Sequence, residues 1–245
     1  MYIIGDIGNT EIKIFLISLK KKIKKKIVLK TNQITFKNLN KSIKVLLNKN
    51  LKIKKIIFSS VVPNKFLIIS KFFKINLKIK CVDIKNLNLK NYINILVNRR
   101  QVGSDRLANA ISVIDNKNNY IVIDFGTATT FDVIKKKNYY GGVIAPGVEL
   151  SLINLSNKAS LIPIIKKISK SKKIVGKNTI DAVKSGFYWG YTGLINKIIK
   201  SIIKETRSNY KIIMTGGLAH LFKNSIDYNS KVDKEITLKG LIKLI

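Results

Sequence analysis

DIGNT at residues 6–10 and DFGTA at residues 124–128 are two copies of one pattern, about half a chain apart. Each copy follows an apolar stretch, residues 2–7 and 120–124, and precedes a second stretch with strand-like alternation. Repetition of one strand–turn–strand unit in the two halves of a chain indicates duplication. The sequence therefore predicts an α/β protein of two duplicated lobes with a cleft between them, residues 1–114 and 115–245.

The residues of these turns suit a phosphate-binding role. Glycine allows a tight backbone on which N–H groups can converge on a phosphate oxygen. A neighbouring carboxylate can hold Mg²⁺ directly or through water. One such turn would be weak evidence, because turns rich in Asp and Gly are common. Two copies predict that Asp6 and Asp124 lie beside a nucleotide's phosphates, where neutralising charge is the main task of phosphoryl transfer.

A third motif, GSDR at residues 103–106, opens a stretch with helical spacing of apolar residues over 105–114. A carboxylate here, Asp105, could accept the proton of an attacking alcohol, and Arg106 could bind a substrate carboxylate through two parallel hydrogen bonds. The alternative is a helix cap with a surface ion pair.

Two further glycine-containing segments are candidate ligand contacts. GGVIAPG at 141–147 predicts a rigid loop that approaches a small ligand, or a purely structural turn. TGG at 215–217 follows a strand and precedes a short helix, which suits an adenine nucleotide. A long amphipathic helix is predicted over 179–204, with three glycines along one face that indicate close helix packing or an interface. GKNT at 176–179 lacks the earlier glycine and the Lys-Ser/Thr pair of a P-loop.

Composition limits the other functional classes. The 245 residues include 47 Lys and Arg against 13 Asp and Glu, a net charge of +34, which by itself suggests nucleic acid or an anionic surface. The lysines are spread along the chain with abundant Ile and Asn, which favours compositional drift. No secretory signal or membrane span is predicted, and the single cysteine, Cys81, excludes an internal disulfide. A cytoplasmic location is expected.

The ordered set DIGNT, VGSDRLANA (102–110), IDFGTATTFD (123–132), GGVIAPG, GKNT and TGG resembles type III pantothenate kinases over nearly the whole chain. The resemblance implies two actin/ribonuclease H-like lobes of the acetate and sugar kinase/Hsp70/actin superfamily. It implies transfer of phosphate from ATP to pantothenate, the first step of coenzyme A synthesis, with Mg²⁺, a K⁺ or NH₄⁺ ion, and a homodimer.

Roles are transferred to this chain from the resemblance residue by residue. Asp105 is the implied general base, Asp6 the Mg²⁺ ligand and Asp124 the ligand of the monovalent cation. ATP is expected to contact Asp6, Gly8, Asn9, Thr10, Lys13, Thr127, Thr130, Gly216 and Gly217. Pantothenate is expected to contact Tyr92, Asn98, Gly103, Ser104, Arg106, Gly142, Ile144, Gly147 and, from the partner subunit of a homodimer, the residue Thr179.

The chain departs from the family pattern on the pantothenate side. Arg99 follows Asn98 where the family usually has proline, and the family's Ala-x-Leu-Pro segment is loosened at residues 159–163. Two other functions stay open from the sequence. One is a DNA-binding regulator, because the Bvg accessory factor resembles the same family, and the other is a kinase of the same fold acting on a sugar or short acid.

Overall fold

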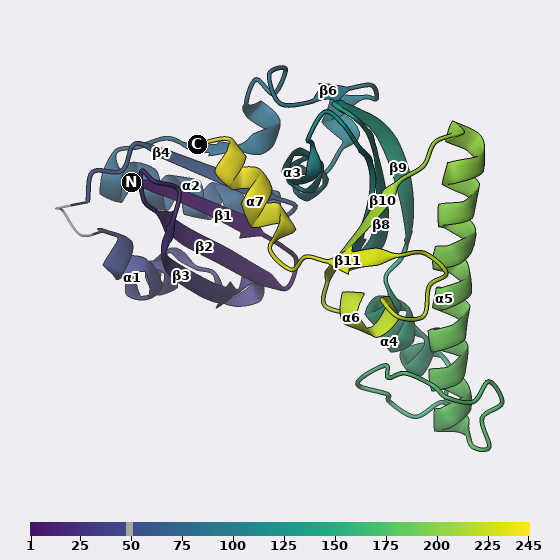
Figure 1. Ribbon diagram of the computed structural model, residues 1–245. Helices are drawn as coiled ribbons and strands as arrows, with labels where there is room; N and C mark the ends of the chain where they lie inside the picture. The colour runs from purple at the N-terminus through teal and green to yellow at the C-terminus, as the bar shows by residue number, and fades with distance from the viewer. Residues whose placement is uncertain (48–50) are drawn as a thin grey trace. The chain divides into compact units, whose positions relative to one another are not determined.

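The computed structural model describes residues 1–47 and 51–245, and their contacts divide the chain into two compact units (Figure 1). The first unit contains residues 1–114 and 235–245, and the second contains residues 115–234. Each unit is a mixed sheet with helices packed against it. None of the helices in the described residues has the length and apolarity of a membrane span.

The first unit contains a five-stranded sheet in the order β3-β2-β1-β4-β5. β1 is antiparallel to β2 and parallel to β4, and β4 is parallel to β5. Its elements are β1 (Tyr2–Ile7), β2 (Glu11–Ile17), β3 (Ile23–Lys30), η1 (Thr31–Gln33), α1 (Phe36–Ile43), η2 (Lys44–Leu47), β4 (Lys55–Ser60), α2 (Pro63–Leu77), β5 (Cys81–Asp83), η3 (Ile84–Asn86), β6 (Asn94–Ile95), η4 (Arg99–Gln101), α3 (Ser104–Val113) and α7 (Ile236–Lys243).

Apolar alternation along the strands builds the core of this unit. Ile12 and Ile14 of β2 and Ile56 and Phe58 of β4 are fully buried against residues of α1 and α2. The lysine-rich segment at 20–26 is a turn and the exposed start of β3. An edge strand of this kind keeps its charged side chains in solvent, which discourages pairing with other chains.

The second unit repeats the arrangement of the first. Its strands lie in the order β11-β10-β7-β8-β9, which read from the other end matches the order of the first sheet. β7 is antiparallel to β8 and parallel to β10. The elements are β7 (Asn119–Phe125), β8 (Ala128–Lys135), β9 (Asn138–Pro146), α4 (Val148–Lys158), α5 (Thr179–Thr206), β10 (Lys211–Gly216), α6 (Ala219–Phe222) and β11 (Ser230–Val232). The predicted duplication of an α/β unit is confirmed.

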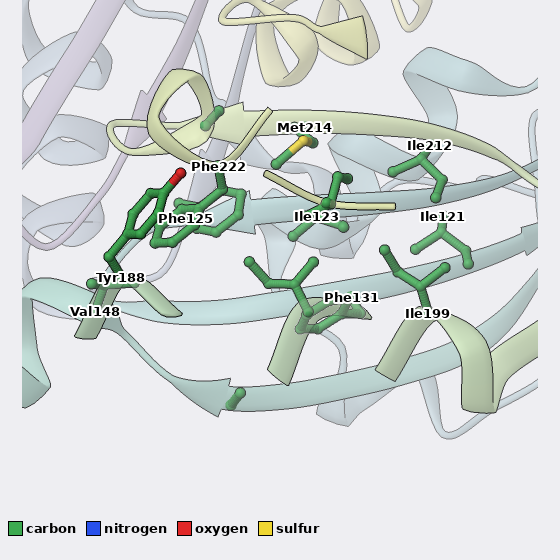
Figure 2. Packing of buried hydrophobic residues seen from close by; sticks show 14 of the residues in the cluster. Ile121, Ile123, Phe125, Phe131, Val148, Tyr188, Ile199, Ile212, Met214 and Phe222 are labelled. Atoms are coloured by element: carbon green, nitrogen blue, oxygen red, sulfur yellow. The ribbon is translucent and has the colours of Figure 1, made fainter. Parts of the chain in front are cut away.

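The core of the second unit lies between its sheet and α5 (Figure 2). Ile121, Ile123 and Phe125 alternate along β7 and face this core. Phe125 stacks on Phe222 with a ring-centroid distance of 5.3 Å, and Phe222 stacks on Tyr188 of α5 at 6.0 Å. We call the DIGNT and DFGTA segments the first and second Asp-Gly turns. Because Phe125 lies between Asp124 and Gly126, this packing fixes the base of the second turn.

The structure corrects the predicted second lobe, 115–245, at its end. α7 packs against α3, β1 and β4, so residues 235–245 belong to the first unit. Thr237 Oγ1 donates to Asn109 Oδ1 at 2.7 Å, and a Cβ on Gly240 would lie only 1.9 Å from the carbonyl oxygen of Ala108. The sequence shows an apolar helix at its end but not which sheet that helix covers.

The predicted rigid loop at 141–147 is also wrong for most of its length. Residues 138–146 form β9, paired with β8 in antiparallel register, with Phe131 opposite Val143. The glycines lie near an irregularity in this pairing between Val133 and Ile134, where Gly141 has φ 124°. Glycine at a bulge bends a strand without ending it, so the pattern was mistaken for a loop.

Candidate active site

The first Asp-Gly turn joins β1 to β2 and presents polar side chains at the end of β1. Asp6 is partly buried and lies opposite Lys13, while Asn9 and Thr10 are exposed. The backbone N–H of Gly8 donates to the carbonyl oxygen of Glu11 at 3.0 Å. Thr31 Oγ1 donates to the carbonyl oxygen of Gly8 at 2.7 Å and supports the turn from below. The turn therefore holds a carboxylate beside exposed donors.

The carboxyl ends of the parallel strands β1, β4 and β5 meet at one edge of the first sheet, where ligands commonly bind in open α/β sheets. Asp6 is in register with Ser59 of β4, and Phe58 is in register with Asp83 of β5. Val61 N donates to the carbonyl oxygen of Ile7 at 3.1 Å and continues this edge.

α3 begins at the same edge. Ser104 Oγ donates to Asp83 Oδ1 at 2.7 Å, which ties the first residue of the helix to the end of β5. Asp105 Oδ1 accepts from the backbone N–H of Arg106 at 2.8 Å, so the carboxylate folds back over the helix start. A Cβ on Gly103 would lie 2.4 Å from Asp105 Oδ1. Glycine at position 103 therefore leaves the space in which the carboxylate lies.

The electrostatics of this edge suit a proton acceptor. Burial raises the pKa of the Asp105 carboxyl, against the hydrogen bond from Arg106 N–H and the positive charges of Arg106 and Lys85. Burial likewise raises the pKa of Asp83, against hydrogen bonds from Lys85 N–H and the Ser104 hydroxyl. A carboxylate whose pKa lies above its usual range is a stronger base than an exposed aspartate and is typical of functional sites.

The second Asp-Gly turn joins β7 to β8. Asp124 is partly buried and is flanked in the sheet by Thr130 of β8 and Thr215 of β10. Gly126 N donates to the carbonyl oxygen of Ala128 at 3.1 Å, while Thr127 at the tip is exposed. A carboxylate between two threonines offers oxygen ligands that a hard monovalent cation accepts.

Two glycines from other segments close against the second turn. A Cβ on Gly147 would lie 2.1 Å from the carbonyl oxygen of Thr127, and one on Gly216 would lie 2.4 Å from that of Phe125. Gly216 has φ 87°, which disfavours any side chain, and Gly217 N donates to the carbonyl oxygen of Phe125 at 3.2 Å. Bare backbone thus surrounds this turn on two sides.

The remaining predicted residues lie in varied surroundings. Gly142, Ile144 and Gly217 are exposed, and Thr179 is exposed at the start of α5, where Asn178 caps the helix by accepting from Asp181 N at 2.9 Å. The other predicted ligand contacts in the first unit are Tyr92, which is 37% exposed, and Asn98, whose side chain accepts from Arg100 N at 3.1 Å.

Ser104 is fully buried, unlike the other predicted contacts that have a polar side chain. Its hydroxyl has Asp83 as an internal partner, so this side chain has no face open to a ligand in this conformation. Asp83 is not part of any motif that the sequence indicates as functional. Its only signal is an aspartate at the end of a short apolar strand, CVD at 81–83.

The guanidinium of Arg99, where the family usually has proline, donates to the carbonyl oxygens of Lys85 and Leu87. It therefore ties the segment before α3 to the segment after β5. Proline has no group that could make these contacts.

Comparison with known proteins identifies the family. The sequence pattern of the type III pantothenate kinases matches residues 2–201. A type III pantothenate kinase from Pelagibacter ubique strain HTCC1062 is 55% identical over 243 residues, which cover 99% of this chain and 98% of that protein. The chain belongs to the type III pantothenate kinase family.

Solved structures support the two-lobed fold. A protein assigned as a 2-dehydro-3-deoxygalactonokinase from Sinorhizobium meliloti gives a TM-score of 0.63 at 9% identity, covering 98% of this chain and 97% of its own. A Campylobacter jejuni protein described as a Baf family transcriptional activator gives 0.59 at 20% identity, covering 99% and 96%. At such identities the likeness shows the fold alone. It does not favour a DNA-binding role for this chain.

Proposed function

We propose that this chain transfers the γ-phosphate of ATP to the hydroxyl of pantothenate and forms 4′-phosphopantothenate. The observation that carries the proposal is the family membership, with whole-chain identity to a type III pantothenate kinase. The surroundings of Asp105 support it, because a partly buried carboxylate with a raised pKa lies beside Arg106 at the strand-end edge of the first sheet. A hydroxyl and a carboxylate are the two groups that such a pair would recognise.

In the proposed reaction Asp105 accepts the proton of the pantothenate hydroxyl as its oxygen forms a bond to the γ-phosphorus. The bond from that phosphorus to the β–γ bridging oxygen breaks, and ADP leaves with the electron pair. Arg106 binds the pantothenate carboxylate and orients the hydroxyl toward Asp105. Gly103, Tyr92, Asn98, Gly142, Ile144 and Gly147 are proposed as further pantothenate contacts.

Several residues are proposed to contact the ATP phosphates. Gly8, Asn9, Thr10 and Lys13 would contact them from the first turn, Thr127 and Thr130 from the second, and Gly216 and Gly217 would pack against the nucleotide. The exposed Asn9 and Thr10 and the bare backbone around Gly216 support this assignment.

Two cations are part of the proposal. Mg²⁺ usually takes one or two protein carboxylates and fills its shell with water and substrate phosphate. No cluster of three acidic, histidine or cysteine side chains exists in the described residues, so the single carboxylate of Asp6 fits Mg²⁺ held mainly by ATP. Asp124 between Thr130 and Thr215 fits K⁺ or NH₄⁺. When bound, the cations neutralise charge on the phosphates.

A homodimer is the proposed assembly. Phe187, Tyr191 and Leu194 of α5, with Leu155 of α4 and Pro146, line an open apolar groove of about 420 Å³. Gly186, Gly190 and Gly193 would place a Cβ in open space, and Trp189 is 39% exposed beside them. Such a face fits a second copy, from which Thr179 would reach pantothenate. Light scattering of Gly190→Gln should give a monomer, and an unchanged dimer would contradict this interface.

We also propose the cytoplasm as the compartment. Cys81 is the single cysteine of the chain, and it is a buried, free thiol on β5. Burial raises its pKa, so it stays protonated and unreactive, as suits a structural residue of a reducing compartment.

The proposed function is tested by ADP release from ATP on addition of pantothenate, with Asp105→Asn as the decisive variant. Loss of the general base should lower kcat by about 10²–10⁴-fold. In the wild type the rate should fall on the acid side through a pKa above the usual range of an aspartate carboxyl, because burial raises the pKa of this base. A wild-type rate in Asp105→Asn would reject the role of Asp105.

The same variant should lose activity but gain stability at pH 7. A carboxyl whose pKa is raised on folding binds more protons in the folded than in the unfolded chain, so its contribution to stability falls as pH rises above 3.8. Asp105→Asn removes this cost at pH 7 and should therefore raise Tm. A lowered Tm at pH 7, with a wild-type Tm at pH 3, would contradict burial of the charge.

A further inference from the structure

We propose that Asp83 is a positioning residue that acts through Ser104 to hold the candidate base, Asp105, at a fixed place beside the first Asp-Gly turn. The inference rests on the proposed function, because it presumes that Asp105 accepts the substrate proton. It concerns two buried residues, and one of them, Ser104, was expected from the resemblance to contact pantothenate but has no face open to a ligand. All of its contacts lie within the first unit.

Asp83 joins three separate segments of the chain. Its Oδ1 accepts from Ser104 Oγ at the start of α3 and from Lys85 N in η3, at 2.7 and 2.8 Å. Its carboxylate also accepts from the backbone N–H of Ser60 at the end of β4. One buried side chain therefore fastens the helix that carries the candidate base to the end of a strand.

The strand end in question lies next to the first Asp-Gly turn. In the parallel pairing of β1 with β4, Asp6 is opposite Ser59, and Ile7 is opposite Ser60. The path from Asp105 through Ser104, Asp83 and Ser60 thus reaches the strand that carries the candidate Mg²⁺ ligand. Because proton acceptor and phosphate must be aligned for transfer, a shift of about 1 Å along this path can cost about 10²-fold in rate.

The hydrogen bond from Ser104 to Asp83 is a side-chain contact that ties the start of α3 to another element. The N-cap residue of α3 is Gly103, which has no side chain to cap the helix. The hydrogen bond that Asp105 Oδ1 accepts from Arg106 N is local, so it moves with the helix and does not fix the place of the helix. Ser104 and Asp83 are both buried, and a hydrogen bond shielded from water is strong and directional.

The test compares two serines of the same helix. Ser104→Ala removes the contact with Asp83, whereas Ser112→Ala removes a hydrogen bond of equal length, 2.7 Å, from Ser112 Oγ to the carbonyl oxygen of Asn109. Ser104→Ala should lower kcat by about 10-fold or more while KM for ATP stays within 2-fold, and Ser104→Thr should restore kcat. Ser112→Ala should keep wild-type kcat.

A double-mutant cycle separates positioning from simple destabilisation. If Ser104 acts through Asp83, Asp83→Ala and the double variant Asp83→Ala/Ser104→Ala should have the same kcat, measured well below their Tm. Equal Tm losses in Ser104→Ala and Ser112→Ala with wild-type kcat in both, or additive kcat losses in the cycle, would overturn the inference. Should Asp105→Asn keep a wild-type rate, the proposed function itself would fail, which is a different outcome.

Discussion

The turn after β1 and the turn after β7 each carry an aspartate as the second-to-last residue of a strand, followed by a glycine at the tip. Their surroundings differ. A side-chain hydrogen bond from Thr31 Oγ1 to Gly8 O supports the first turn, and the residues at its tip are exposed. The second is enclosed by the backbone at Gly147 and Gly216, where no side chain fits. The two copies of the unit therefore differ in how the turn is held: the first by a side-chain hydrogen bond, the second by backbone packed against it.

The largest difference between the turns should appear when each carboxylate is removed. Asp6→Asn should lower kcat/KM by about 10²–10³-fold, because it takes a charge from the proposed Mg²⁺ ligand where the phosphates bind. Asp124→Asn should cost less and should abolish the difference between rates in K⁺ and in Na⁺. The measurement is initial rate against the concentration of each cation. Equal losses with K⁺ dependence kept in both variants would contradict the division of roles.

The next largest effect should come from adding a methyl group at a glycine that packs against the second turn. Gly147→Ala places a methyl group 2.1 Å from the carbonyl oxygen of Thr127, so urea unfolding should show a loss of about 1–3 kcal/mol. Gly126→Ala is the matched control at the turn itself, since its Cβ would meet Ala128 O at 3.6 Å, an ordinary contact. If the two variants unfold at the same urea concentration, the second turn is not enclosed as described.

The smallest effect concerns the support of the first turn. Thr31→Val should lower stability by about 0.5–1.5 kcal/mol and raise KM for ATP, because it removes the hydrogen bond beneath Gly8. Thr206→Val removes a hydrogen bond of equal length, 2.7 Å, to the carbonyl oxygen of Ile202 in α5. That control should lose stability without a change in KM. An unchanged KM in Thr31→Val would separate this threonine from the nucleotide.

The sequence predicted the fold well where a pattern is local. Strand alternation and the repeated turns were enough to infer two duplicated α/β units, because such patterns report which side chains face a core. The prediction of a loop at 141–147 was wrong because a glycine-rich sequence looks the same whether the glycines lie at a strand irregularity or in a loop. The prediction that residues 235–245 belong to the second lobe was wrong. An amphipathic pattern shows that a helix is half-buried, but it does not show which of two sheets the helix covers.

The sequence predicted residues of the candidate site only where they lie within a recognisable motif. Asp6, Asp105 and Asp124 each lie within a recognisable pattern, and the structure gives each a partly buried place at a strand or helix end. Asp83 is 22 residues from Asp105 in sequence, and the fold places the end of β5 at the start of α3, where Ser104 bonds to Asp83. The motif around Ser104 indicates a substrate contact, whereas in the structure this side chain is buried and bonds to Asp83.

The most direct test of the account is the purified chain's ATP-dependent phosphorylation of a panel of vitamins, sugars and short hydroxy acids, in K⁺ and in Na⁺, with the product identified by mass. The account predicts 4′-phosphopantothenate as the main product, formed only with Mg²⁺ and much faster in K⁺. Faster phosphorylation of a sugar, or no transfer to pantothenate in K⁺ by a folded protein, would contradict it.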